Sequence, residues 1–149
     1  MKKLLFLLAI SALSSPAVAP SKYDKKLADS LGADEYGMKK YVLAILKTGP
    51  ATIEDKKVTD SLFRGHMDNI NRLVKEKKLI VAGPLGKNDL TYRGIFILDV
   101  PTVEQARALV DTDPTVKSGV FAVEYLPWYG SAALPVYLET SERISKESH

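Results

Sequence analysis

Residues 58–84 read VTDSLFRGHMDNINRLVKEKKLIVAGP, and their pattern indicates a long helix followed by a short strand. Apolar residues recur in the first part of this stretch at helical spacing, which predicts a helix from Val58 to Lys78 with Thr59 or Asp60 as the N-cap. Leu79 to Ala82 then form a short apolar run, which predicts a buried strand that ends at Gly83-Pro84. The apolar stripe of the helix consists of Leu62, Phe63, His66, Ile70, Leu73 and Val74.

Three more strands and a second helix flank this stretch. Apolar and β-branched runs predict strands at Lys40 to Lys47, at Tyr92 to Val100 and at Val120 to Leu126, where Pro127 stops the last of them. Thr102 to Val110 starts with a capping residue and has an apolar face, which predicts the second helix. The order β-α-β-β-α-β is the ferredoxin-like arrangement, so we predict an α+β fold with one four-stranded antiparallel sheet and both helices on one face.

The face of the sheet that points away from the helices needs a cover. We expect this face to carry Tyr41, Phe96, Leu98, Phe121 and Tyr125. A large exposed apolar face usually packs against a partner, and a two-fold homodimer packed sheet to sheet is the simplest solution. The apolar segment Trp128 to Leu138 would cover or reach across that partner, and Glu139 to His149 is expected to form a polar tail.

The first residues carry the three-part layout of a secretory signal peptide. Lys2 and Lys3 precede an apolar run from Leu4 to Leu13, and Ala17-Val18-Ala19 supplies small residues at the spacing of a cleavage site. The run is shorter than the roughly twenty residues that a spanning helix needs, so we predict a signal peptide at residues 1–19 in preference to an uncleaved anchor. The product would be periplasmic or secreted, with no stable membrane insertion after cleavage.

The rest of the chain is expected to hold one domain. Residues 20–38 would form a flexible lead-in with a short helix near Lys25 to Ser30, residues 39–130 the domain, and residues 131–149 an extension. The absence of cysteine excludes disulfides, thiolate nucleophiles and cysteine-based metal sites. With histidine only at positions 66 and 149, a His-rich metal site within one chain is excluded too.

Charge and composition limit the partners. The net charge of +3 is scattered and forms no basic stripe, so nucleic acid is not an expected partner. No cofactor is expected. Haem with His66 as an axial ligand is the one alternative, and no other residue argues for it.

Three short motifs, in this order, resemble a known family. They are Arg64-Gly65-His66-Met67-Asp68-Asn69 on the predicted helix, Ala82-Gly83-Pro84 after the short strand, and Asp113-Pro114 with Thr115 to Val120 before the last strand. Over Lys39 to Tyr129 the chain resembles the YciI-like, or YCII-related, family. The resemblance implies a dimeric α/β barrel of ferredoxin-like subunits and a His–Asp active centre, which falls on His66 and Asp113. That family is related by fold to muconolactone isomerases, and some members are dehalogenases of chlorinated lactones.

His66 and Asp113 each have two interpretations. A lone histidine on an apolar helix face is more often an inert core residue, but histidine is also the side chain best suited to move a proton near neutral pH. Asp113 would fix the tautomer of that histidine as its carboxylate partner. The alternative is that Asp113-Pro114 is only a common turn after a helix.

Four further residues are candidates for contact with a small-molecule ligand. Gly83 and Pro84 form either a plain turn after a strand or a place where the backbone approaches a ligand closely. Arg64 would either hold an anionic group or lie in solvent. Ser118 would line the pocket.

Three functions fit these residues. The first is a cofactor-free acid–base enzyme of the isomerase, lyase or dehalogenase type, in which His66 moves a proton of a small organic acid or lactone and Asp113 orients the imidazole. The second is a module that binds a small molecule without catalysis, and the third is a dimeric structural module that works through its sheet face. Hydrolysis through a covalent intermediate is not favoured, because the sequence has no nucleophile motif.

Overall fold

The computed structural model describes residues 23–146. The predicted signal peptide at residues 1–19 and the end of the predicted tail at His149 therefore lie outside the described residues. Within them, no helix is both long and apolar enough to cross a bilayer.

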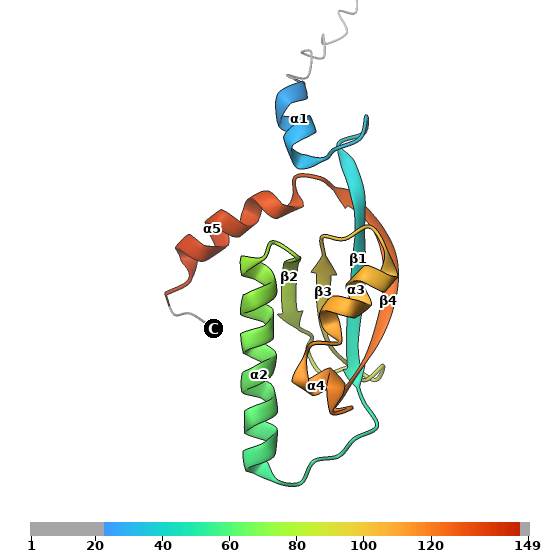
Figure 1. The fold of residues 1–149 in the computed structure, drawn as a ribbon, viewed down its shortest axis with the longest axis vertical. Coiled ribbons are helices and arrows are strands. Elements are labelled where there is room, and N and C mark those ends of the chain that lie inside the picture. The colour runs from blue at the N-terminus through green and yellow to red at the C-terminus, as the bar shows by residue number, and fades with distance from the viewer. Residues whose placement is uncertain (1–22, 147–149) are drawn as a thin grey trace, which may run out of the picture.

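One sheet and the helices on one of its faces make up the domain (Figure 1). The strands run in the order β2-β3-β1-β4, and each neighbouring pair is antiparallel. This is the predicted ferredoxin-like α+β arrangement, because each helix connects two strands that have a third strand between them. Its elements are β1 (Met38–Thr48), α2 (Lys56–Lys75), β2 (Leu79–Pro84), β3 (Tyr92–Leu98), α3 (Val103–Val110), α4 (Pro114–Lys117) and β4 (Phe121–Ser131).

Helix α2 begins and ends earlier than the sequence pattern predicts. The predicted N-cap, Thr59 or Asp60, is wrong, because Asp55 caps the helix by accepting hydrogen bonds from the backbone N–H groups of Lys57 and Val58. The helix ends at Lys75 and not at Lys78, since Lys77 adopts a positive φ of 57° that helical backbone does not allow.

The prediction of which residues face away from the helices is largely wrong. In the β1–β3 and β1–β4 pairs, Ala44 lies opposite both Phe96 and Tyr125, and directly paired residues point to the same face. That face packs against the helices, so Phe96, Leu98, Phe121 and Tyr125 all belong to the core side. Both faces of these strands are apolar, so alternation in the sequence does not distinguish them. Tyr41 does lie on the outer face, next to Trp128, with 5.4 Å between the ring centroids.

The outer face of the sheet is apolar. The register places Leu43 opposite both Ile97 and Leu126, and Ile45 opposite Ile95, so these side chains form one patch. Leu126 is 41% exposed, and the other four are only partly buried. The partial exposure of these residues leaves room for a partner, and the homodimer that would bury the patch stays a prediction.

Strand β4 continues past the proline that was expected to end it. Pro127 lies opposite Val42 in the middle of the β1–β4 pair. Because β4 is an edge strand, a residue whose N–H would point outward needs no hydrogen-bond partner, and proline is accepted there. Trp128 therefore belongs to the sheet rather than to a separate extension.

Two short helices lie at the ends of the described chain. Helix α1 (Lys25–Leu31) occurs where a short helix was expected and stands beyond the end of β1 in Figure 1. The predicted polar tail instead forms helix α5 (Tyr137–Ile144), preceded by the single turn η1 (Leu134–Val136). The Tyr137 hydroxyl donates to the backbone oxygen of Ile80 at 2.5 Å, which ties this end of the chain to the edge strand β2.

Candidate active site

A glycine in α2 allows the two parts of the site to meet. A Cβ atom on Gly65 would lie 2.8 Å from Cγ of Pro114, a distance that requires a shift. Helix α2 can therefore pack closely on α4 at this point. Asp113 is the N-cap of α4, and the next residue after Gly65 is His66, so the close approach brings their side chains together.

The His66–Asp113 pair is joined by a short hydrogen bond to a fully buried carboxylate. Nδ1 of His66 lies 2.6 Å from Oδ2 of Asp113. The other carboxylate oxygen accepts from both the backbone N–H of Thr115, at 2.9 Å, and its hydroxyl, at 2.6 Å. The side chain of Asp113 is 0% exposed, so its orientation is set by these protein contacts alone.

Asp113 remains an anion in this setting. Burial by itself would raise the pKa of the carboxyl group, but hydrogen bonds from His66 and Thr115 outweigh burial and hold the pKa of Asp113 below its ordinary value. A carboxylate only accepts hydrogen bonds, so Nδ1 of His66 carries the proton in the pair. In the neutral ring, Nε2 is then the nitrogen with a free lone pair.

Aromatic rings surround the imidazole. Phe96 stacks on it, with centroids 6.0 Å apart and planes 19° from parallel, while Phe121 and Phe63 meet it edge to face at 5.6 and 6.3 Å. The His66 side chain keeps 12% of its surface exposed, and Phe63 is 40% exposed beside it. The structure describes no protein hydrogen bond to Nε2 within residues 23–146. The geometry thus leaves Nε2 available at the edge of an apolar surround.

The other predicted ligand residues lie in less specific settings. Ser118 ends α4 and donates its hydroxyl hydrogen to the Thr115 backbone oxygen at 3.2 Å, which is a structural contact. Arg64 is exposed on α2. Gly83 and Pro84 are not in a loop but in strand β2, opposite Ile95 and Gly94 of β3. The binding roles of all four stay predictions.

Thr115 and the three phenylalanines belong to the site although their sequence pattern was not assigned to it. Thr115 was predictable from the order Asp-Pro-Thr, because proline at the first position after an Asp N-cap is typical of a helix start. Phe96 and Phe121 were missed because they were assigned to the wrong face of the sheet.

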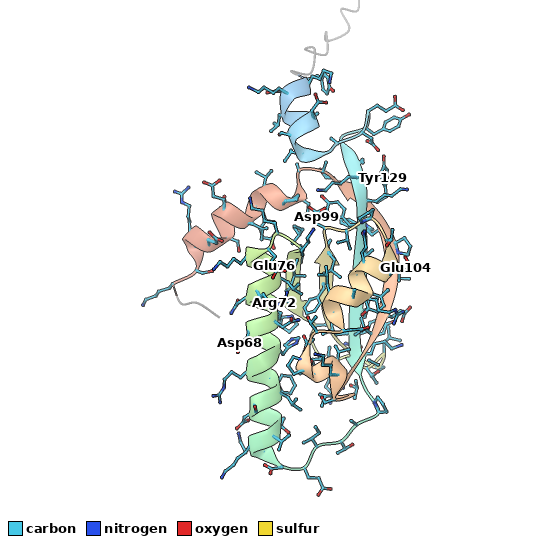
Figure 2. The ribbon with its side chains drawn as sticks, viewed as in Figure 1. Asp68, Arg72, Glu76, Asp99, Glu104 and Tyr129 are labelled. Atoms are coloured by element: carbon cyan, nitrogen blue, oxygen red, sulfur yellow. The ribbon has the colours of Figure 1, made fainter. Side chains whose placement is uncertain are left out.

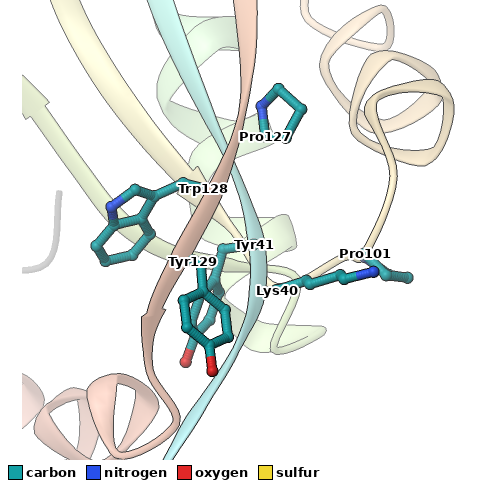
Figure 3. Close-up of a pocket in the computed structure, with 6 residues that line it drawn as sticks. All are labelled: Lys40, Tyr41, Pro101, Pro127, Trp128 and Tyr129. Atoms are coloured by element: carbon teal, nitrogen blue, oxygen red, sulfur yellow. The ribbon is translucent and has the colours of Figure 1, made fainter.

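Two hollows of the described surface lie away from His66. One, of about 350 Å³, is lined by Lys40, Tyr41, Pro101, Pro127, Trp128 and Tyr129 (Figure 3). Another, of about 420 Å³, lies between α1 and the residues around Ala132. Among residues 23–146, no three His, Asp or Glu side chains gather as metal ligands would.

Comparison with known proteins identifies the family. A solved structure of 5-chloro-2-hydroxyhydroquinone dehydrochlorinase from Burkholderia phenoliruptrix AC1100, in complex with 2,5-dihydroxybenzoquinone, is 22% identical in sequence and has a TM-score of 0.44; the match covers 59% of this chain and 92% of that one. No curated protein matches the chain. The family model described as the YCII-related domain matches residues 40–129, which include β2 and β3 in full, most of β1 and β4, and both members of the His66–Asp113 pair. The chain therefore belongs to the YCII-related family.

Proposed function

We propose that this protein is a cofactor-free acid–base enzyme of the isomerase, lyase or dehalogenase type, acting on a small organic acid or lactone. The observation that supports this most strongly is the 2.6 Å contact between His66 Nδ1 and the fully buried Asp113 carboxylate. Such a contact fixes the ring and stabilises the imidazolium that forms when Nε2 takes a proton.

The proposed reaction starts at a carbon–hydrogen bond next to a carbonyl group. Nε2 of His66 takes the proton, and the electron pair of the broken bond moves onto the carbonyl oxygen as an enolate. In an isomerisation the imidazolium returns the proton to another carbon of the enolate system. In an elimination the enolate expels a leaving group, such as a halide, from the adjacent carbon, and the proton passes from His66 to water.

An inert core histidine fits the contacts less well. A buried histidine with only a structural role normally has both ring nitrogens paired, because an unpaired buried polar atom is destabilising. His66 uses Nδ1 for both of its described hydrogen bonds and keeps part of its ring exposed. These features favour a ring that exchanges protons with a ligand.

The proposed enzyme acts as a homodimer outside the cytoplasm. The dimer is supported by the apolar outer face of the sheet, where Leu43, Ile45 and Ile95 remain partly exposed. Export is supported by the signal-peptide pattern of residues 1–19, which precede the described domain.

Exchange of carbon-bound hydrogen tests the function without a known substrate. A panel of small organic acids and lactones would be incubated with the mature protein in D₂O, and loss of the C–H signals would be followed by proton NMR. We expect catalysed exchange for at least one compound, loss of it in His66→Gln, and retention in Asp68→Asn, a control on the exposed side of the same helix (Figure 2). Ligand line broadening without exchange would instead identify a binding module.

A further inference from the structure

A second polar contact joins α2 to residues 111–113, the loop between α3 and α4, and lies beside the His66–Asp113 pair. Asn69 is three residues after His66, on the same face of α2, and Thr112 directly precedes Asp113. Oδ1 of Asn69 lies 2.8 Å from the hydroxyl oxygen of Thr112. Two neighbouring positions of the helix thus contact two consecutive residues of the loop.

Arg72 hydrogen-bonds to both Asn69 and Thr112 and so completes a network of three side chains. Its Nη2 atom donates to Oδ1 of Asn69 at 2.8 Å and to the Thr112 hydroxyl oxygen at 2.9 Å. Its Nη1 atom donates to Glu76, which lies one turn further along α2 (Figure 2). A guanidinium group only donates, so the oxygen of the Asn69 amide must face Arg72 and the orientation of that amide is fixed.

The link to the loop does not depend on where the Thr112 hydroxyl hydrogen points. That hydroxyl also lies 2.6 Å from the backbone oxygen of Leu109, and its single hydrogen serves only one acceptor. If the hydrogen goes to Leu109, Nη2 of Arg72 still bridges Asn69 and Thr112.

Stability of the core does not explain the amide at position 69. Asn69 is only 7% exposed, and its Nδ2 atom has no hydrogen-bond partner among the described residues. A buried donor without a partner is destabilising relative to an apolar side chain of the same size. Arg72 and Thr112 are exposed, so water would satisfy both if Asn69 were replaced by leucine.

We infer that Asn69 is a positioning residue, which with Arg72 holds Thr112 so that the Asp113 carboxylate meets Nδ1 of His66. Backbone contacts tie the loop to α3, for example the N–H of Asp113 to the oxygen of Val110 at 2.9 Å. Apart from the contacts of His66 itself, Asn69 and Arg72 provide the hydrogen bonds described from α2 to this loop. The role of this network in catalysis rests on the proposed function. Its effect on the geometry of the His66–Asp113 pair is independent of that function.

The test compares stability with the state of the pair in Asn69→Leu. The thermal unfolding midpoint would be measured beside the proton NMR signal of the His66 Nδ1–H, which is shifted downfield by its hydrogen bond to a carboxylate. We expect the Nδ1–H signal to be lost to exchange with water, while the protein stays folded and its midpoint falls no further than that of Asp113→Asn, because Asn69→Leu also removes a buried donor without a partner. In the exchange assay, kcat should fall about 100-fold with KM little changed, the size of effect that misplacement of a catalytic group produces.

Three more variants make the test decisive. Thr112→Val removes the exposed end of the network and should also lose the signal, whereas Thr112→Ser keeps the hydroxyl and should restore it. Glu76→Gln, which removes only the exposed ion pair with Arg72, is the matched control and should leave the signal unchanged. An unchanged signal in folded Asn69→Leu or Thr112→Val would overturn the inference. Loss of the signal in a protein that shows no exchange activity would support the positioning role and count against the proposed function.

Discussion

The charge of Asp113 makes the His66–Asp113 pair sensitive to acid. Because hydrogen bonds hold the pKa of Asp113 below its ordinary value, this carboxylate binds protons less readily in the folded state than in the unfolded state. Its contribution to stability is therefore complete above the unfolded pKa of about 3.9 and is lost as the pH falls through the lower folded pKa.

An Asp113→Asn variant should show this dependence on pH. Near neutrality we expect it to lower the free energy of unfolding by about 1.5–3 kcal/mol, the range for hydrogen bonds to charged groups. The difference from the unsubstituted protein should shrink below about pH 4, where the carboxylate becomes protonated. Urea unfolding at a series of pH values measures both quantities, and a difference that stays constant into acid would contradict the assignment.

At the scale of elements, the site depends on how closely α2 approaches α4. Gly65 in α2 faces the ring of Pro114, and the approach leaves no room for a methyl group. In most exposed helix positions Gly→Ala stabilises a protein, by about 1 kcal/mol, because glycine is a poor helix former. Here the steric conflict opposes that gain.

Gly65→Ala should therefore destabilise the protein, by about 1–3 kcal/mol as for other overpacked sites. It should also weaken the His66–Asp113 contact, because the helix that carries His66 must move away from α4. Gly83→Ala is the control, since a Cβ atom there would have no neighbour within 4 Å. Denaturant unfolding of both variants checks the prediction, which fails if Gly65→Ala is as stable as the unsubstituted protein.

Local sequence patterns predicted the helices and strands better than they predicted the tertiary contacts of these elements. The order of the four strands and of the two main helices followed from apolar periodicity. Helix α4 was not predicted, although an Asp N-cap followed by Pro114 is typical of a helix start. The continuation of β4 past Pro127 could not be predicted from the sequence, because it depends on β4 being an edge strand of the sheet. The face of the sheet on which Phe96 and Tyr125 lie was predicted wrongly, because the strands are apolar on both faces.

At the scale of the whole molecule, the apolar outer face of the sheet remains to be covered. It combines Leu43, Ile45, Ile95, Ile97 and Leu126, with the ion pair of Lys47 and Glu124 beside them at 3.4 Å. A patch of this kind is typical of an interface. The same face cannot be inferred from a single element, because it exists only once three strands are in register.

Sedimentation velocity of the mature protein tests the interface. We expect a dimer at micromolar concentration and a folded monomer for Ile95→Lys, because a lysine in the middle of the patch would place a charge in an apolar interface. Leu90→Lys, at a loop position that is 65% exposed, is the control and should stay dimeric. A monomeric unsubstituted protein would contradict the homodimer.

Asp113 fixes His66 with its proton on Nδ1 and leaves Nε2 free to accept one. The most direct measurement is ¹⁵N–¹H correlation NMR of the imidazole ring in alkaline buffer, for the mature protein and for Asp113→Asn. We predict the Nδ1–H tautomer in the unsubstituted protein and a shift toward the Nε2–H tautomer in the variant, since an amide also offers Nδ1 a donor. If the two proteins show the same tautomer, or if the unsubstituted protein carries its proton on Nε2, the pair does not work as proposed.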